Sequence, residues 1–234
     1  MIAALLLALS LAAPLAGTTV VLDPGHQLGN ARFPAETSRP VPAGGFTKPC
    51  NTTGTSTDGG YPEATFTWQV ARQVRSRLRG LGAEVVMTRT SNRADRWGPC
   101  VDVRGRAGNR IDADLKVSIH ADGSYAAGAR GFHVITPASR PRWTADVAEE
   151  SADLARDVRR GLRRSGVPVA GYVAGGDGID VRGDLATLNL SDVPVVLAEL
   201  GNMRNAADAR RMTGARGRAT YAAGLVRGIR VHLR

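Results

Sequence analysis

The sequence predicts one α/β domain in which a mixed, mostly parallel β-sheet carries helices on both faces. Short apolar, β-branched runs alternate along the chain with stretches of helical periodicity. Several of these runs end in a polar residue, as buried strands do where they deliver side chains to the open edge of a sheet. No internal repeat or linker divides the 234 residues, a length that suits one domain.

The first half of the chain predicts two strands separated by a long loop and a helix. Residues 18–22 and 83–88 are the strands, and residues 27–60 are a polar segment rich in Gly, Pro and Thr. Loops of that length inside a domain are usually functional or disordered. Pro62 and Glu63 begin the helix, since proline suits the first turn and a carboxylate suits the positive helix end. Its buried side and its end are marked by Phe66, Val70, Val74 and Leu78, then by Gly80 and Gly82.

The second half continues the alternation. Predicted strands lie at 115–119, 131–136 and 193–198, and predicted helices lie at 103–113, 144–164 and 206–233. A glycine-rich loop at 174–180 precedes the last strand. The chain therefore builds one sheet domain over residues 18–234.

Residues 1–17 differ in kind from the rest. Residues 2–13 are an Ala/Leu run, and small residues follow at 14–17, where a signal peptidase would cut. The run is too short to span a bilayer comfortably, which favours a cleaved secretory signal peptide over residues 1–17. Because the segment has no Lys or Arg, an uncleaved anchor is the alternative. Either route predicts an exported protein, in the periplasm or cell wall or secreted, with no stable membrane span after signal cleavage.

The two cysteines predict one disulfide bond. Cys50 and Cys100 both lie in polar, loop-like sequence, and an exported protein meets an oxidising compartment. Two unrelated thiols are the alternative. Neither residue has the close Cys/His spacing of a structural zinc site.

The net charge of +10 is carried almost wholly by arginine, with lysine only at Lys48 and Lys116. Such a surface is attracted to an anionic polymer, which for an exported protein is the cell wall. Nucleic acid is a weaker candidate, because the arginines are spread along helices and aromatic residues for base stacking are scarce. A purely compositional bias toward arginine explains the charge equally well.

Polar residues at the ends of apolar runs predict a metal centre. His26 ends the run at 20–26, and His120 follows the run at 117–119. A catalytic zinc site needs three protein ligands and an open position for water, and Glu63, at the start of its helix, is the predicted third ligand. Glu199, after the run at 195–198, is the predicted carboxylate that accepts the proton of the water and passes it to the leaving amine.

Each of these residues alone also has a structural interpretation. His26 ends a sequence typical of a plain turn, and His120 is a candidate core histidine. Glu63 is a candidate first-turn helix acid, and Glu199 a candidate ion-pair partner for arginine. Their joint placement favours the metal centre. His133 and His232 lack this context and are predicted to be structural or solvated.

Together these motifs resemble the zinc-dependent N-acetylmuramoyl-L-alanine amidases of the amidase-3 type. The likeness is carried, in that family's order, by 20–26, Glu63 with its helix, 104–109 leading into 113–115, 118–121 and 193–202. It covers residues 19–232 and makes residues 18–234 an amidase-3-type catalytic domain. The resemblance implies that His26, Glu63 and His120 bind one Zn²⁺ per chain and that Glu199 is catalytic. It also implies hydrolysis of the amide between the lactyl group of N-acetylmuramic acid and L-alanine of the stem peptide.

The chain departs from the family in several places. After the Glu-Leu-Gly motif, where family members often have hydrophobic residues, this chain has Asn202 and Met203, and we expect this to alter the pocket wall more than the mechanism. A short Gly/Ala-rich stretch at 123–130 stands where partner-controlled members carry an occluding helix, so we expect an open site and no activator protein. The loop with Cys50 is similar to that of exported actinobacterial members, and wall-binding repeats are absent from the sequence. We therefore expect a monomer that prefers muropeptide fragments to intact peptidoglycan. Arg182 and Asn189, in the loop and strand before Glu199, are predicted substrate contacts on position alone.

Two alternatives remain open at this point. A zinc peptidase or carboxypeptidase acting on stem peptides shares the same site logic. A non-catalytic cell-wall-binding protein with a decayed site is less favoured, because all three predicted ligands and Glu199 are present. Nucleic-acid binding is disfavoured by export.

Overall fold

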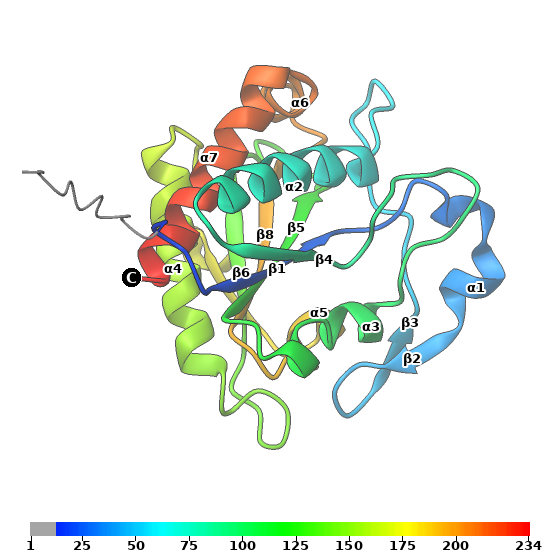
Figure 1. The fold of residues 1–234 in the computed structure, drawn as a ribbon. Coiled ribbons are helices and arrows are strands. Elements are labelled where there is room, and N and C mark those ends of the chain that lie inside the picture. The colour runs from blue at the N-terminus through cyan, green and yellow to red at the C-terminus, as the bar shows by residue number, and fades with distance from the viewer. Residues whose placement is uncertain (1–12) are drawn as a thin grey trace, which may run out of the picture.

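Six strands form the main sheet in the order β4-β1-β5-β8-β6-β7, in a computed structural model that describes residues 13–234 (Figure 1). The strands are β1 (Thr19–Pro24), β4 (Glu84–Met87), β5 (Leu115–Asp122), β6 (His133–Pro137), β7 (Ile179–Arg182) and β8 (Val195–Asn202). Strands β4, β1, β5 and β8 are mutually parallel, whereas β6 runs antiparallel to β8 and pairs in parallel with β7. The predicted mixed, mostly parallel sheet is confirmed.

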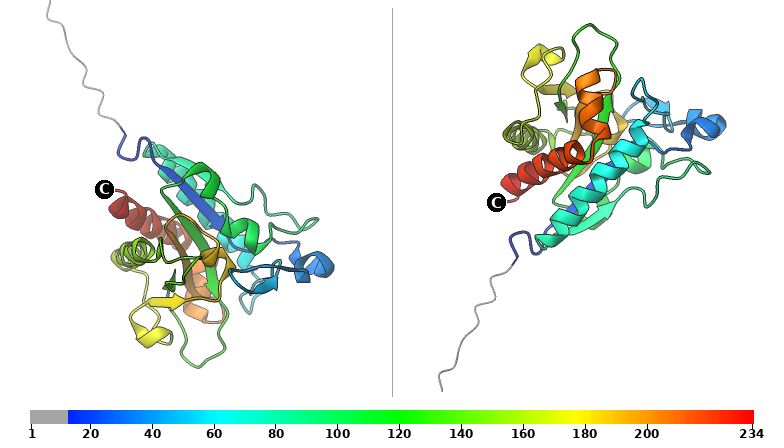
Figure 2. Two further views of the ribbon diagram at one scale, coloured as in Figure 1. Left: turned by 90° about the horizontal axis from the view of Figure 1, so that it is seen from below. Right: turned by 90° about the horizontal axis from the view of Figure 1, so that it is seen from above.

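Helices cover both faces of the sheet, as predicted. Helices α2 (Glu63–Gly80), α4 (Ala148–Arg164) and α7 (Ala215–His232) lie side by side on one face (Figure 2). The short helices α3 (Val101–Gly105) and α5 (Ala186–Asn189) lie on the other face, and α6 (Ala206–Thr213) precedes α7. The larger core lies under the three long helices, where Phe66 of α2 meets Tyr221 of α7 edge to face at 5.6 Å.

Helix α2 confirms the predicted helix, and its position matters for the site. Pro62 precedes its first residue, and Phe66, Val70, Val74 and Leu78 are all buried on its inner side. That apolar face packs against β1 and β5. The packing fixes the first turn of the helix, and with it Glu63, beside the carboxyl ends of these strands.

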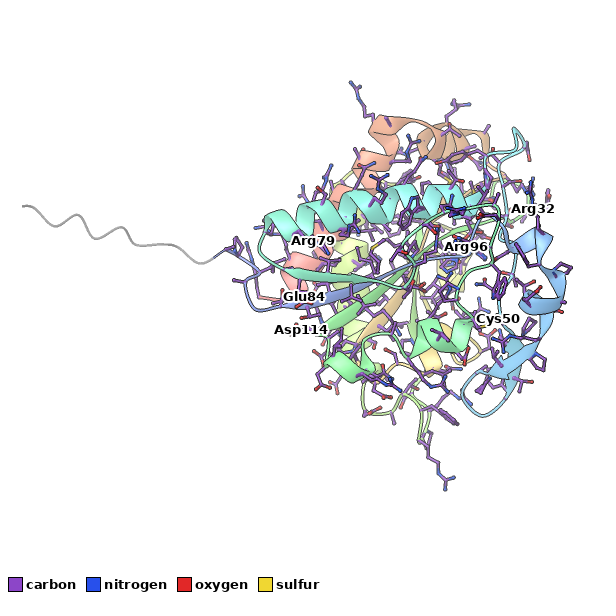
Figure 3. All side chains as sticks on the ribbon, turned by 45° about the vertical axis from the view of Figure 1, so that its right-hand side comes forward. Arg32, Cys50, Arg79, Glu84, Arg96 and Asp114 are labelled. Atoms are coloured by element: carbon purple, nitrogen blue, oxygen red, sulfur yellow. A yellow bond between two sulfur atoms is a disulfide. The ribbon has the colours of Figure 1, made fainter. Side chains whose placement is uncertain are left out.

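The predicted unstructured segment at 27–60 contains regular structure, so that part of the prediction is wrong. Helix α1 (Pro34–Ser38) leads into a small hairpin of β2 (Pro40–Pro42) and β3 (Thr47–Pro49). Three-residue strands bounded by prolines are too short to show a periodicity. Arg32 and Cys50 of this segment lie near Arg96, at the opposite end of the molecule from Arg79, Glu84 and Asp114 (Figure 3).

Several other element boundaries also differ from the prediction. The predicted helix at 103–113 is divided into α3, which ends at Gly105, and a 3-10 turn at Asn109–Ile111; between them Gly108 has a φ of +105°, which a right-handed helix excludes. The predicted helix at 206–233 is divided at Gly214 into α6 and α7. The segment predicted as loop at 174–180 leads into β7, and α5 was not predicted. Strands β5 and β8 continue past 119 and 198, which places His120 and Glu199 inside strands.

One charged side chain is fully buried beneath α3. Lys116 of β5 has no exposed surface, and its ammonium group donates to the main-chain carbonyls of Arg104 and Gly105 at the end of α3. Burial lowers the pKa of Lys116 to about 7. The charge therefore serves as the C-terminal cap of a short helix, at a cost in desolvation.

Residues before the predicted domain boundary at 18 pack against the domain. Leu15 is 2% exposed and belongs to the main core, and its N–H donates to the carbonyl of Leu81 at 2.9 Å. The signal peptide was predicted over residues 1–17. Residues 1–12 lie outside the described residues, so the signal peptide stays a prediction. Across residues 13–234, none of the helices combines the length and the apolar character needed to cross a membrane.

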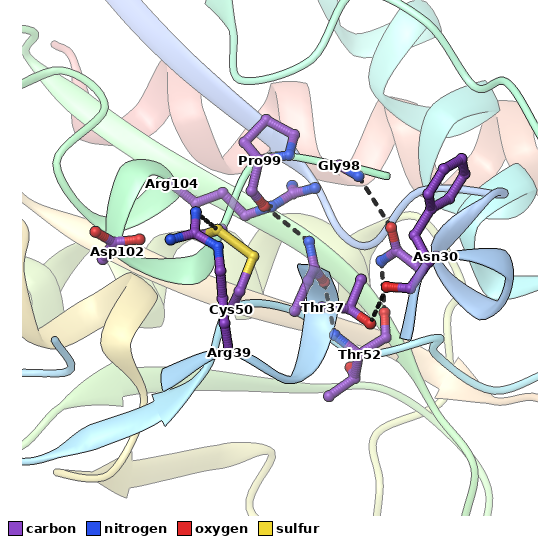
Figure 4. The surroundings of a disulfide bond; sticks show 12 residues. Asn30, Thr37, Arg39, Cys50, Thr52, Gly98, Pro99, Asp102 and Arg104 are labelled. Atoms are coloured by element: carbon purple, nitrogen blue, oxygen red, sulfur yellow. Dashed lines mark hydrogen bonds between the residues drawn. A yellow bond between two sulfur atoms is a disulfide. The ribbon is translucent and has the colours of Figure 1, made fainter. Parts of the chain in front are cut away.

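The predicted disulfide is present between Cys50 and Cys100 (Figure 4). It joins the residue after β3 to the residue before α3, and both cysteines are buried. Next to it, the Asn51 side chain donates to the carbonyl of Pro99 at 2.8 Å. The bond therefore holds residues 30–60, called the 30–60 segment below, against the sheet edge at which the predicted site residues lie.

Candidate active site

Three of the predicted site residues converge at the carboxyl ends of the parallel strands. His26 follows β1, Glu63 is the first residue of α2, and His120 lies in β5. Oε1 of Glu63 is 3.1 Å from Nε2 of His26 and 3.0 Å from Nδ1 of His120. One donor atom from each residue lies within 4.8 Å of the others, so the cluster could hold a metal ion. The structure thus brings together the residues that the sequence predicted as ligands.

Neighbouring groups fix the orientation of the ligands. Nδ1–H of His26 donates to the carbonyl of Thr52 at 3.0 Å, which turns Nε2 toward Glu63. Oε2 of Glu63 accepts from the N–H of Thr55 at 2.9 Å, and Oε1 accepts from the N–H of Ala121 at 3.1 Å. The ring centroids of His26 and His120 are 4.9 Å apart in an edge-to-face arrangement. These contacts fix the positions of the donor atoms relative to one another.

The electrostatics of the cluster are those of tightly coupled groups. Burial alone would raise the pKa of Glu63, but the charges and hydrogen bonds of His26 and His120 hold that pKa below its ordinary value. Burial likewise opposes a charge on His26, and the carboxylate of Glu63 outweighs it and raises the pKa of that imidazole. The carboxylate of Glu63 and the imidazole of His26 therefore favour each other's charged form.

Two glycines make room for this arrangement. A Cβ on Gly25 would lie 2.3 Å from the imidazole of His120. A Cβ on Gly54 would lie 2.8 Å from Oε2 of Glu63, and Gly54 also has a φ of +76°. Any side chain at either position would displace a ligand, a requirement that is visible only once the packing is known.

A buried ion pair supports the turn that carries His26. Asp23 of β1 pairs with Arg104 of α3 at 2.6 Å, and both side chains are almost fully buried. Arg104 also donates to the carbonyls of Pro24 and His26, at 2.8 and 2.7 Å. Burial alone would raise the pKa of Asp23, but Arg104 and the hydroxyls of neighbouring residues hold it well below its ordinary value.

Arg89 makes a second connection, between the His26 turn and α2. Its guanidinium donates to the carbonyl of Pro24 at 2.9 Å and to that of Ala64 at 2.8 Å. Ala64 directly follows Glu63. Sequence reasoning did not identify Asp23, Arg89 or Arg104 as parts of the site, because their partners lie 25 to 81 residues away along the chain.

Glu199 lies beside the cluster, in the neighbouring strand. It is the register partner of His120 in the parallel pairing of β5 with β8. The side chain is partly buried, and Oε2 has no hydrogen-bond partner among residues 13–234. Burial raises the pKa of Glu199 well above its ordinary value, and the carboxylates of Glu63 and Asp122 raise it further. A buried carboxyl group with a raised pKa beside a possible metal site is a candidate general acid or base.

A pocket of about 190 Å³ opens at the same edge. His26 and His120 form one wall, and Lys48 and Thr52 of the 30–60 segment form another. Leu185 and Leu197 supply the apolar part of its lining. A small polar molecule with an apolar portion fits such a lining.

The two predicted substrate contacts lie in a strand and a helix, not in the loop and the strand that were predicted for them, and their environments differ. Arg182 ends β7 with its side chain 40% exposed, and it makes two 2.8 Å hydrogen bonds with Asp184. Asn189 is fully buried on α5, and its amide donates to the carbonyls of Ala43 and Gly183. The structure thus leaves Arg182 accessible and does not bring Asn189 to the surface.

The two remaining histidines also differ. His232 ends α7 and lies against α4, 3.7 Å from Asp157, in agreement with a structural role. His133, also predicted to be structural or solvated, is 5% exposed and is the register partner of Glu199 in the pairing of β6 with β8. Its place next to Glu199 depends on a pairing of distant segments that the sequence does not show.

An open-edged α/β sheet, a His–Glu–His cluster and an adjacent buried carboxyl group are features typical of metal-dependent hydrolases. Comparison with known proteins gives the family. The family model for N-acetylmuramoyl-L-alanine amidase matches residues 20–231. The chain is 46% identical over 218 residues to the N-acetylmuramoyl-L-alanine amidase Rv3717 of Mycobacterium tuberculosis, covering 93% of this chain and 87% of the relative.

Solved structures agree with this assignment. The crystal structure of the N-acetylmuramyl-L-alanine amidase Ami1 from Mycobacterium smegmatis superposes with a TM-score of 0.87 at 42% identity, covering 94% of this chain and 98% of that one. The apo form of Ami1 from Mycobacterium abscessus also gives 0.87, at 44% identity, covering 94% and 100%. The chain belongs to the N-acetylmuramoyl-L-alanine amidase family and is a hydrolase.

Proposed function

We propose that this protein is a zinc-dependent peptidoglycan amidase. It hydrolyses the amide between the lactyl group of N-acetylmuramic acid and L-alanine of the stem peptide. The observation that carries the proposal is the convergence of His26, Glu63 and His120 on one point, with Glu199 in the adjacent strand. The family model and the mycobacterial relatives, which are named for this activity, support it.

Zinc fits the donor set. Two imidazole nitrogens and a carboxylate oxygen are ligands that Zn²⁺ accepts, and three protein ligands leave a fourth position open. The hydrogen bond from His26 to Thr52 is of the kind that orients a zinc-bound imidazole. When bound, zinc polarises a carbonyl group and lowers the pKa of water toward neutrality.

The protein's own side chains would transfer the proton, hold the ligand anion and bind the substrate. Glu199 would accept the proton of the attacking water and return it to the nitrogen of L-alanine as the amide bond breaks. Glu63 would stay an anion, held by the N–H groups of Thr55 and Ala121. Arg182, exposed near Glu199, is a candidate partner for a carboxylate of the stem peptide.

The proposal also covers access to the site, the oligomeric state, export and the preferred substrate. Residues 123–130, between β5 and β6, form a short loop without a helix that could occlude the cluster. We therefore propose an open site, and we expect that adding a purified activator protein leaves the rate unchanged. We also propose that the enzyme is monomeric, is exported and prefers muropeptide fragments to intact peptidoglycan. Faster release of stem peptide from intact sacculi than from muropeptides would overturn the preference for fragments.

Two conservative variants test the proposed roles. Glu199→Gln should retain about one zinc per chain and lose at least about 100-fold in turnover, because only the proton-transfer group is removed. Glu63→Gln should lose zinc and activity together, because a ligand anion is removed. An active Glu199→Gln enzyme would reject its role as base, and a Glu63→Gln enzyme that keeps zinc would reject the ligand set.

A further inference from the structure

His133 and Glu199 occupy one row of side chains across the sheet. Glu199 in β8 pairs with His120 in β5 on one side and with His133 in β6 on the other. Register partners point to the same face of a sheet, and their Cβ atoms lie about 4.5–5.5 Å apart. The row therefore reads His120, Glu199, His133, with a proposed metal ligand at one end and an imidazole of no assigned role at the other.

The two neighbours each bury a polar atom that is not hydrogen-bonded. Among residues 13–234, Nδ1 of His133 and Oε2 of Glu199 are both fully buried and without a partner. Leaving a buried polar atom unpaired costs about 1–3 kcal/mol. An imidazole N–H can donate and a carboxylate oxygen can accept, so the two unpaired atoms are chemically complementary.

An aromatic ring lies against the imidazole of His133. The ring of Tyr172 packs edge to face against it, with centroids 6.4 Å apart, and the Tyr172 hydroxyl donates to Oδ2 of Asp122 at 2.6 Å. Asp122 ends β5, the strand that carries His120. Burial also lowers the pKa of His133, so the ring is neutral at neutral pH and carries one N–H.

We propose that His133 is a positioning residue for Glu199, donating from Nδ1 to Oε2 and so directing the other carboxylate oxygen toward the proposed metal ligands. Asp122 and Tyr172 hold the imidazole in place, and the imidazole holds the carboxylate. This inference rests on the proposed function, in which Glu199 carries the proton of the attacking water. A fixed carboxylate matters because proton transfer depends on short, aligned contacts.

Three substitutions of His133 test which atom acts. Asn places an amide near the position of Nδ1, Gln places it near Nε2, and Phe keeps the ring volume without a donor. His133→Phe should lower kcat by about 10- to 100-fold, the usual effect of losing a supporting hydrogen bond at a metal site. KM, zinc content and thermal midpoint should stay near the wild-type values. His133→Asn should restore most of kcat, and His133→Gln should not.

The double variant with Glu199→Ala shows whether the effect passes through Glu199. In that background His133→Phe should cause no further loss, because the group it positions is gone. A kcat within twofold of wild type for His133→Phe would overturn the proposal. So would equal activity of the Asn and Gln variants, or an undiminished loss in the Glu199→Ala background.

A measurement without turnover separates this inference from the proposed function. ¹⁵N NMR of the histidine rings should show His133 protonated at Nδ1, with a resonance that moves in Glu199→Ala and not in Glu84→Ala, a control on β4. If the wild-type protein cleaves no muropeptide but the resonance moves, the proposed function fails and the His133–Glu199 contact stands. If the enzyme is active and the resonance does not move, the contact is refuted.

Discussion

The disulfide offers a sharp test of how the 30–60 segment is held. Cys50 and Cys100 are 50 residues apart in the sequence, and both are buried. For a loop of that length, the loss of chain entropy in the unfolded state amounts to about 4 kcal/mol at 25 °C. For a domain of this size, that corresponds to a thermal midpoint lowered by about 8 to 16 °C. We expect this shift for the double variant Cys50→Ala, Cys100→Ala.

The assay is thermal unfolding followed by circular dichroism, on the variant and on the wild-type protein with and without reductant. Reduced wild-type protein keeps both sulfur atoms, so it separates the lost cross-link from the small cavities left by alanine. The variant should also bind zinc more weakly, because Thr52, two residues after Cys50, accepts the hydrogen bond of His26. A midpoint within 2 °C of oxidised wild type for both proteins would show that hydrogen bonds, and not the cross-link, hold the segment.

Two further predictions concern buried charges. Asp23→Asn should lower the free energy of unfolding by about 3–5 kcal/mol in urea titrations, since it leaves the guanidinium of Arg104 buried without its carboxylate. Asp95→Asn, which breaks an exposed ion pair, is the control. A loss for Asp23→Asn no larger than that of the control would contradict the role of the buried pair. The pKa of Lys116 is about 7 in the folded protein and near 10.5 in the unfolded chain, so the unfolded state binds more protons between these values and stability should rise with pH across that window. Lys116→Met should remove this rise, whereas Lys48→Met, at a partly exposed lysine, should keep it; a stability profile with the same slope in all three proteins would refute the assignment.

The parts of this molecule that the sequence predicts are those encoded by local pattern. Helix α2 follows from the spacing of Phe66 to Leu78, and the strands β1, β5 and β8 follow from continuous apolar runs. The ligand set was predictable because parallel strands deliver their carboxyl ends to one edge. The resemblance to a known family then assigned the roles.

The rest depends on contacts between distant segments. The hairpin of β2 and β3 is too short for a periodicity, and β7 is a four-residue strand preceded by glycines. The buried guanidinium groups of Arg89 and Arg104 donate hydrogen bonds to a carbonyl and a carboxylate of β1. His133 lies next to Glu199 because β6 pairs antiparallel with β8, in a sheet that is otherwise mostly parallel. Such pairings carry no local signature in the sequence.

Mass spectrometry of a defined muropeptide incubated with the purified protein tests whether the protein is a zinc-dependent amidase. Metal content is measured on the same sample, and a parallel reaction contains a chelator. We expect about one zinc per chain and release of an intact stem peptide beginning with L-alanine, abolished by the chelator. Cleavage within the peptide would make the protein a peptidase, and no cleavage with no bound metal would contradict the account.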